Sequence, residues 1–148
     1  MKNVSKLHAT RRAFIASSAA SLLVPAVARS QTPPRMQVSF ASEVVIYRMH
    51  DNPTARDLIS MLPAELEITD FSTNEKIVRL PRRLDEGGFE DFDDETPGDL
   101  CYFLGWGNLA MFYDDFTFRN DLIRLGHIEG SVEPLRHKGT YPVRIELL

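Results

Sequence analysis

The sequence predicts a mainly β domain, either a small barrel or a sandwich, built from about eight short strands and one helix. Two observations favour this fold class. From residue 36 onward, short stretches of alternating apolar and polar residues are separated by frequent turn residues, as in all-β domains. Only one stretch places its apolar residues at helical spacing. The chain has 148 residues, enough for one domain of ordinary size.

The N-terminal part of the chain differs from the rest and is predicted to be a signal peptide. It holds four basic residues and no acidic one, followed by an apolar run over 13–24 and an A-x-A pattern that ends at Ala28. The apolar run is too short to span a membrane. We therefore expect a signal peptide at 1–28, a polar linker at 29–35 and the folded domain at 36–148.

The stretch TRRAFI at 10–15 resembles a twin-arginine export signal, whose pattern is Ser/Thr-Arg-Arg-x-Phe-Leu/Ile. The small residues at 16–21 keep the following run weakly hydrophobic, which also fits that route. The alternative is an ordinary secretory signal in which two arginines are adjacent by chance. The twin-arginine interpretation predicts a periplasmic or secreted protein that crosses the membrane folded. After signal cleavage, we expect no stable membrane insertion.

The first predicted elements of the domain are strands at 36–40 and 44–49, followed by the helix. Asn52 can cap this helix, and Pro53 suits its first position. Pro63 ends it. The residues that give it one apolar face are Ala55, Leu58, Ile59 and Leu62.

Six more strands complete the predicted domain, with one helical turn near its end. The strands are expected at 66–71, 76–80, 100–104, 109–113, 121–128 and 141–147, and the helical turn at 132–137. Alternation in the fifth strand puts Cys101 and Phe103 on one face and Tyr102 and Leu104 on the other. We expect one of these two pairs to lie in the core.

Charge excludes one class of partner. The chain has 17 Lys and Arg against 21 Asp and Glu, and removal of the four basic residues of 1–28 leaves 13 against 21, a net charge of −8. Such an acidic domain lacks the basic footprint that binds nucleic acid. Cys101 is the only cysteine, so no intramolecular disulfide can form, and we expect a buried, inert thiol.

The residues give no sign of a metal or cofactor. The segment 85–99 holds eight acidic residues but lacks the order of an EF-hand, so we favour a solvated, mobile loop over a calcium site. The histidines His50, His127 and His137 have no metal-ligand spacing. Nucleophile-elbow, phosphate-loop and dinucleotide fingerprints are absent as well, and we expect no cofactor and no metal.

Four stretches, in this order, resemble the bacterial cyclophilin-like family, small β-barrels distantly related to the cyclophilin prolyl isomerases. They are DNPTARDLISMLP at 51–63, EKIVRLPRRL at 75–84, PGDLCYFLGWGNLAMFYDDF at 97–116 and LIRLGHIEG at 122–130. The resemblance implies a closed barrel with a helix that plugs one end. It implies no settled activity, because fold does not fix function. The catalytic signatures of the true isomerases (Phe-His-Arg, Gln-Gly-Gly-Asp and Trp-Leu-Asp-Gly-x-His) are absent, which argues against catalysis.

Candidate ligand-binding residues combine aromatic surface with a few polar groups. Trp106, between two glycines, is expected to be partly exposed at the barrel rim. Arg124 lies in an apolar strand and therefore needs a partner, either a buried acid or a ligand. The other candidates are Asn108, Tyr113 and Arg56.

Three functions remain open at this point. The first is a barrel that binds a peptide or small molecule in a groove. The second is a prolyl isomerase in which Arg124 or Arg56 replaces the usual catalytic arginine; an arginine beside an open apolar pocket would favour it. The third is an assembly partner that uses exposed barrel edges.

Overall fold

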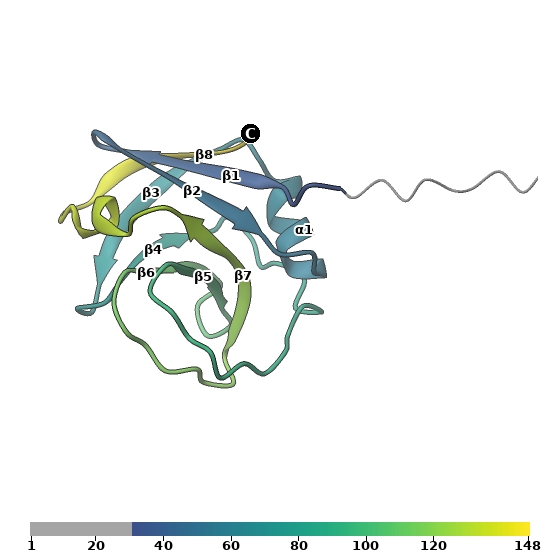
Figure 1. The fold of residues 1–148 in the computed structure, drawn as a ribbon. Helices are drawn as coiled ribbons and strands as arrows, with labels where there is room; N and C mark the ends of the chain where they lie inside the picture. Colours follow the sequence, from purple (N-terminus) through teal and green to yellow (C-terminus); the bar gives the residue numbers. More distant parts are fainter. Residues whose placement is uncertain (1–30) are drawn as a thin grey trace, which may run out of the picture. The chain divides into compact units, whose positions relative to one another are not determined.

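Eight antiparallel strands close into a barrel (Figure 1). The computed structural model describes residues 31–148, so the predicted signal peptide at 1–28 and the start of the linker lie outside the described residues. The strands are β1 (Arg35–Phe40), β2 (Glu43–Met49), β3 (Ala64–Phe71), β4 (Glu75–Arg79), β5 (Asp99–Phe103), β6 (Asn108–Phe112), β7 (Leu122–Glu129) and β8 (Tyr141–Leu147). The helices are α1 (Pro53–Ser60) and the 3-10 helix η1 (Glu133–Arg136).

The order of strands around the barrel is β1-β2-β7-β5-β6-β4-β3-β8, and β8 pairs with β1 to close it. The prediction of a closed barrel with one α-helix is therefore confirmed, and the sandwich is excluded. Each described strand has a partner on both sides, so the described residues present no unpaired strand edge. The hypothesis of assembly through exposed barrel edges gains no support from this part of the chain. None of the helices within 31–148 is long and apolar enough to cross a membrane.

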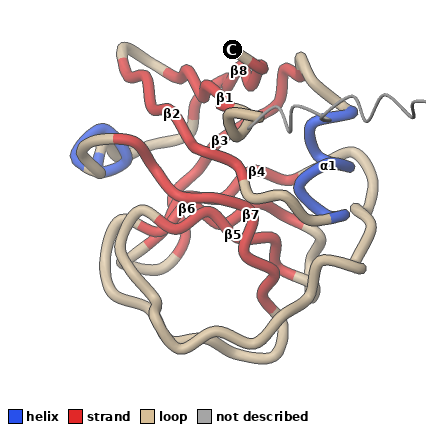
Figure 2. Tube along the Cα trace, turned by 45° about the vertical axis from the view of Figure 1, so that its right-hand side comes forward, coloured by secondary structure: helices blue, strands red, loops and turns tan. Residues whose placement is uncertain are grey.

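The helix begins where the sequence predicts. The Asn52 side chain accepts a hydrogen bond from the Ala55 N–H (2.8 Å), and Pro53 occupies the first turn. The Asn52 amide also donates to the Arg124 carbonyl oxygen (2.9 Å), which joins the helix to β7. Ala55 and Leu58 enter the barrel core. Figure 2 shows α1 at one side of the strands.

The barrel interior is filled by side chains from all eight strands. Tyr102 on β5 and Leu109 on β6 are fully buried there. The sequence also led us to expect that only one face of β5 would be buried, and this expectation is wrong. Cys101, on the opposite face of β5, is also 0 % exposed and lies in a second apolar cluster. Burial raises the pKa of the Cys101 thiol, as expected of an inert cysteine.

The second cluster exists because two loops cover the outer face of β5 and β6. Phe92 comes from the loop between β4 and β5, and Phe116 and Phe118 come from the loop between β6 and β7. These loops run beside the β5–β6 pair in Figure 2. An outer sheet face that would otherwise meet water therefore becomes a site of apolar packing.

Candidate functional site: an aromatic pocket on the outer face of the barrel

A pocket of about 440 Å³ lies on the outer face of β4, β6 and β5. The pairing of β4 with β6 places Glu75 opposite Phe112 and Ile77 opposite Ala110, so these four residues point to the same face. The turn between β3 and β4 and the loop between β6 and β7 supply the walls. Its aromatic lining consists of Phe71, Phe103, Trp106, Phe112 and Phe116.

Trp106 forms the exposed rim of the pocket, with 53 % of its surface accessible. Its ring meets Phe71 edge-on at 5.2 Å between centroids and Phe103 edge-on at 5.6 Å. Gly105 permits this arrangement, because a Cβ there would clash with the Phe103 ring. Gly107 has a φ of +68°, which glycine adopts readily. Glycine is therefore favoured on each side of Trp106 for a different steric reason: space for the Phe103 ring at Gly105, and a positive φ at Gly107.

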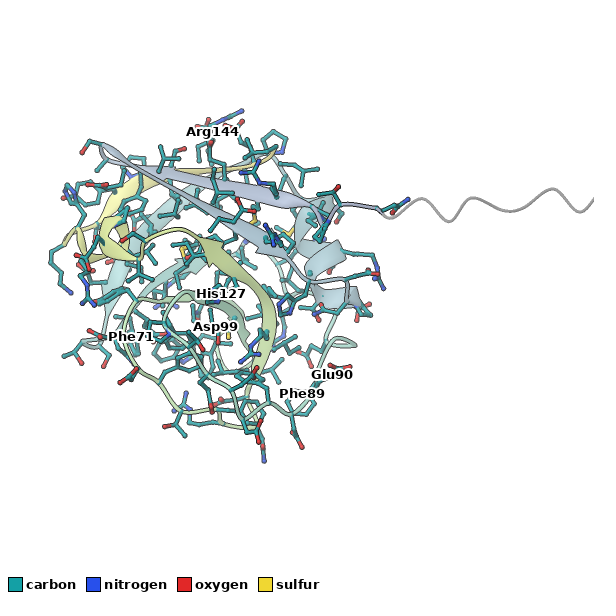
Figure 3. All side chains as sticks on the ribbon, in the orientation of Figure 1. Phe71, Phe89, Glu90, Asp99, His127 and Arg144 are labelled. Carbon is teal, nitrogen blue, oxygen red and sulfur yellow. The ribbon has the colours of Figure 1, made fainter. Side chains whose placement is uncertain are left out.

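A stacked aromatic pair also lines the pocket. The rings of Phe112 and Phe116 lie 3.8 Å apart at an interplanar angle of 6°. Phe112 is the last residue of β6 and is 5 % exposed. Phe116 belongs to the loop between β6 and β7 that covers this face. This contact holds the loop against β6 and gives the pocket a wall of aromatic surface. Phe71 is labelled in Figure 3 at the left of the barrel, where the turn between β3 and β4 borders the same pocket.

Two charged side chains line this pocket, Glu75 and Arg119. Burial raises the pKa of Glu75 to about 7, although the positive charge of Arg119 opposes this rise. Arg119 is largely exposed, forms an ion pair with Asp121 (3.4 Å) and lies 5.7 Å from the centre of the Phe103 ring. The pocket therefore combines aromatic walls with one carboxyl group that titrates near neutral pH and one exposed guanidinium.

Of the five ligand-binding candidates, only Trp106 lines this pocket, and it is exposed as expected. Tyr113 is 1 % exposed and packs in the barrel core, where its hydroxyl accepts a hydrogen bond from Lys138 Nζ (2.7 Å). Asn108 is 2 % exposed, and its amide donates to the Leu109 carbonyl oxygen. Arg56 is exposed and pairs with Asp51.

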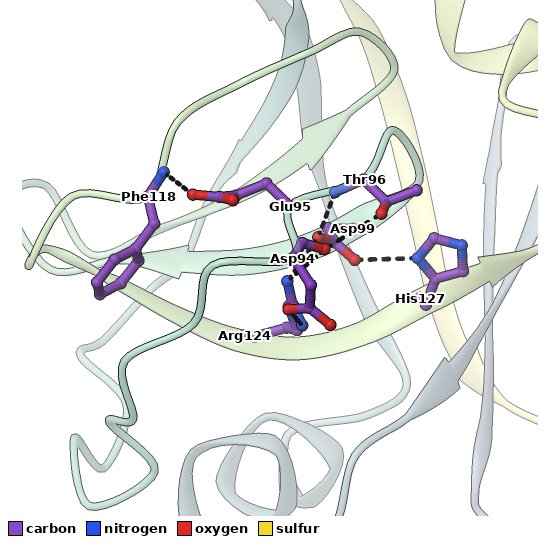
Figure 4. Close-up of polar contacts among 7 residues, drawn as sticks. All are labelled: Asp94, Glu95, Thr96, Asp99, Phe118, Arg124 and His127. Atoms are coloured by element: carbon purple, nitrogen blue, oxygen red, sulfur yellow. Dashed lines mark hydrogen bonds and ion pairs between the residues drawn. The ribbon is translucent and has the colours of Figure 1, made fainter.

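Arg124 has acid partners, one of the two alternatives that the sequence left open. Its guanidinium lies 2.8 Å from an oxygen of Asp94 and 3.2 Å from an oxygen of Asp99 (Figure 4). It also stacks over the Phe92 ring, 4.0 Å from the ring centre. Asp99 is 3 % exposed and also contacts Nδ1 of His127 (3.0 Å). Asp99 and His127 are labelled near the centre of Figure 3, and Figure 4 draws the contact between them.

The same contacts show how the acidic segment 85–99, which is largely exposed as expected of a solvated loop, is attached to the barrel. Most of its side chains are exposed, but the segment is anchored at several points. Asp94 binds Arg124, the Glu95 carboxylate accepts from the Phe118 N–H, and the Asp99 carboxylate accepts from the Thr96 N–H (3.1 Å) (Figure 4). Within 31–148, no group of three or more His, Cys, Asp or Glu side chains is arranged to hold a metal ion.

Sequence reasoning missed Glu75, Phe71, Phe116 and Arg119 as pocket residues. The position of Glu75 could have been predicted, because the alternation of the fourth strand puts it on the same face as Ile77. The positions of Arg119 and Phe116 could not have been predicted from the sequence. They belong to an irregular loop whose path over β5 and β6 has no periodic pattern.

With this geometry established, comparison with known proteins assigns the family. The cyclophilin-like family model matches residues 38–146, and the chain belongs to the cyclophilin-like family. The solution structure of a hypothetical protein from Archaeoglobus fulgidus is similar, with a TM-score of 0.59 and 14 % identity over 80 % of this chain and 98 % of that one. At that identity the likeness concerns the fold alone. None of the curated proteins matches this chain.

Proposed function

We propose that the domain binds an apolar part of a peptide or small molecule in the aromatic pocket. The observation that carries this proposal is the half-exposed Trp106 at the rim of a pocket of about 440 Å³ with four phenylalanines in its walls. Concave, mostly apolar sites with a few polar groups are the usual form of ligand sites. Buried Ala110 and Ile77, which also line the pocket, add apolar surface beneath the rings.

The experiment is a titration of the full chain with short proline- and phenylalanine-containing peptides. Trp106 is the only tryptophan, so its fluorescence reports on this pocket alone. We expect saturable changes in intensity, and the loss of binding, followed by NMR, in Trp106→Ala. Val44→Ala is the matched control, because Val44 is 52 % exposed on β2 and does not line the pocket. Equal binding by both variants would rule out this pocket.

A second candidate function is prolyl cis–trans isomerisation. It is favoured by Arg119, an arginine beside an open apolar pocket. Isomerisation needs desolvation of the prolyl amide and a donor to its nitrogen, and a guanidinium can supply that donor. Arg124 and Arg56 do not line this pocket, so Arg119 replaces them in this proposal.

Exchange NMR on a proline peptide separates the two functions. The uncatalysed reaction takes tens to hundreds of seconds. Acceleration by the full chain that disappears in Arg119→Gln would establish catalysis at this pocket. Binding without acceleration would leave ligand binding as the function of the pocket.

We also propose that the protein is exported by the twin-arginine route and works in the periplasm or outside the cell. The support is the sequence TRRAFI at 10–15 and the following weakly hydrophobic run. The acidic balance of the remaining chain supports the further proposal that nucleic acid is not a partner.

A further inference from the structure

The aromatic pocket contains a carboxyl group without a partner. Among residues 31–148, no side chain or backbone group forms a hydrogen bond or ion pair with the Glu75 carboxyl group within normal distance. Arg119 lines the same pocket but pairs with Asp121 instead. The cross-strand neighbours of Glu75 are Phe71 on β3 and Phe112 on β6, and their rings offer no hydrogen bond of ordinary strength. Glu75 is therefore a partly buried acid in an apolar setting.

The charged and titratable groups around Glu75 are few. Arg119 faces it from the loop between β6 and β7, and the charge of Glu75 in turn helps to raise the pKa of the buried Cys101 thiol on β5. Lys76, the next residue along β4, is 0 % exposed and binds Asp70 at 2.9 Å in place of Glu75. Without a close cation, burial prevails, and the pKa of Glu75 is raised to about 7. Above that pH the pocket carries an unpaired negative charge.

The rings of the pocket attract cations as well. The face of an aromatic ring is negative and binds ammonium and guanidinium groups within about 6 Å of its centre. Two rings of this pocket already do so. Arg79 lies 5.4 Å from the centre of the Trp106 ring, and Arg119 lies 5.7 Å from that of Phe103. Among residues 31–148, no cation lies over the other three rings of the pocket, Phe71, Phe112 and Phe116, so these rings and the Glu75 carboxylate remain for a cationic ligand.

We propose that the ligand of this pocket is an organic cation, with an ammonium group that pairs with Glu75 and an apolar body that packs on the aromatic walls. This inference rests on the proposed binding function and adds the chemical class of the ligand. The excess of acidic over basic residues in the chain also favours the approach of cations over anions. A free amine and a lysine side chain on a peptide share this chemistry.

The test compares matched ligands at pH 8, with Trp106 fluorescence of the full chain as the signal. The first pair is 4-phenylbutylamine, a cation at this pH, and neutral 4-phenylbutanol. The second pair is a blocked Phe-Lys dipeptide and its norleucine counterpart, which distinguishes a peptide source from a free amine. We expect the cation of at least one pair to bind about 10-fold more tightly than its neutral partner.

Removal of the negative charge must remove this preference. Two changes do so independently: titration to pH 5, where Glu75 is protonated and the amine is still charged, and the substitution Glu75→Gln. We expect the neutral ligands to bind as before in both cases. Glu67→Gln, an exposed acid on β3 outside the pocket, is the matched control and should keep the preference.

The outcomes separate the two proposals. Equal binding of cationic and neutral ligands at pH 8 would overturn the cation inference and leave the binding function in place. A cation preference that persists in Glu75→Gln would overturn it too, because the charge would then be recognised elsewhere. If none of the four ligands changes the Trp106 signal, the inference falls together with the proposed function.

Discussion

The guanidinium of Arg124 is held between two carboxylates, 2.8 Å from that of Asp94 and 3.2 Å from that of Asp99, the first residue of β5 (Figure 4). Arg124 belongs to β7, whereas Asp94 lies in the loop that leads into β5. The ion pair with Arg124 also lowers the pKa of Asp94. An arginine in an apolar strand thus serves to fasten the acidic loop to the barrel.

We predict that Arg124→Gln loosens this loop and destabilises the fold by about 1–3 kcal/mol, because buried Asp99 loses a charged partner. The measurement is amide hydrogen exchange at Thr96, whose N–H donates to Asp99, together with urea unfolding. Arg48→Gln is the control, since Arg48 is exposed and pairs with Glu129 at 3.3 Å. Unchanged exchange at Thr96 would contradict this role of Arg124.

Because of Glu75, the free energy of unfolding should decrease as the pH rises from about 4.5 to about 7. Its pKa is raised to about 7 in the folded state, so over this range the folded protein holds a proton that the unfolded chain has released. Glu75→Gln should remove this part of the pH dependence and stabilise the protein by about 1 kcal/mol at pH 8. Chemical denaturation at several pH values, with NMR titration of the Glu75 carboxyl carbon, measures both effects. Parallel pH profiles of the two proteins would refute the prediction.

The Lys76–Asp70 ion pair predicts an asymmetric response to mutation. Lys76 is 0 % exposed, while the Asp70 side chain is 25 % exposed and also accepts from the Gly139 N–H (2.7 Å). Burial tends to raise the pKa of Asp70, but the hydrogen bonds from Gly139 and Lys76 outweigh it and lower the pKa. Asp70→Asn leaves a buried ammonium uncompensated and should destabilise by about 3–5 kcal/mol.

The partner substitution is the control for this pair. Lys76→Met replaces the buried ammonium with an apolar side chain of similar length and leaves Asp70 bonded to Gly139 and open to solvent. It should destabilise clearly less than Asp70→Asn in urea unfolding. The reverse order would mean that the Lys76 ammonium itself stabilises this end of the barrel, and that its neutralisation by Asp70 matters less.

Gly126 marks a close approach of two strands. A Cβ at this position of β7 would lie 2.5 Å from the Arg48 carbonyl oxygen and 3.2 Å from the Met49 Cα on β2. Because these are backbone atoms, the strands would have to separate, and Gly126→Ala should destabilise by about 2–4 kcal/mol. Gly130→Ala is the comparison: it has free space but a φ of +89°, and should cost about 1–2 kcal/mol. Thermal unfolding of both variants checks this order.

Export by the twin-arginine route predicts the effect of a conservative double change. Arg11→Lys with Arg12→Lys keeps the positive charge but removes the paired guanidinium groups of the motif. We expect the protein to stay in the cytoplasm, as seen by fractionation of cells that express the full chain. Normal export of the double variant would favour the alternative of an ordinary secretory signal.

The secondary structure was predictable because its signals are local. Strand alternation, the Asn52-Pro53 start of α1 and the tight turn around Trp106 each depend on a few neighbouring residues, and each element was found within one or two residues of its expected bounds. The family was also predictable, because its motifs keep their order along the chain. These agreements concern the fold, which needs only the pattern of apolar residues and turns.

The pocket was not predictable in the same way. Glu75 and Phe116 are far apart in sequence, and only the pairing of β4 with β6 and the path of the following loop bring them to one pocket. Arg124 showed from sequence alone that it needed a partner, but not that Asp94 and Asp99 would provide it. The side chains that line the site depend on contacts between distant segments.

By itself, therefore, the sequence determined the antiparallel strands, the single α-helix and the family, because backbone periodicity and turn chemistry act over a few residues. Tertiary structure alone decided that both faces of β5 are buried, that Trp106 joins Glu75 in one pocket and that Arg124 is neutralised. Those outcomes follow from closure of the barrel and from loops that fold over its outer face. Both bring together residues whose separation along the chain leaves no local pattern to read.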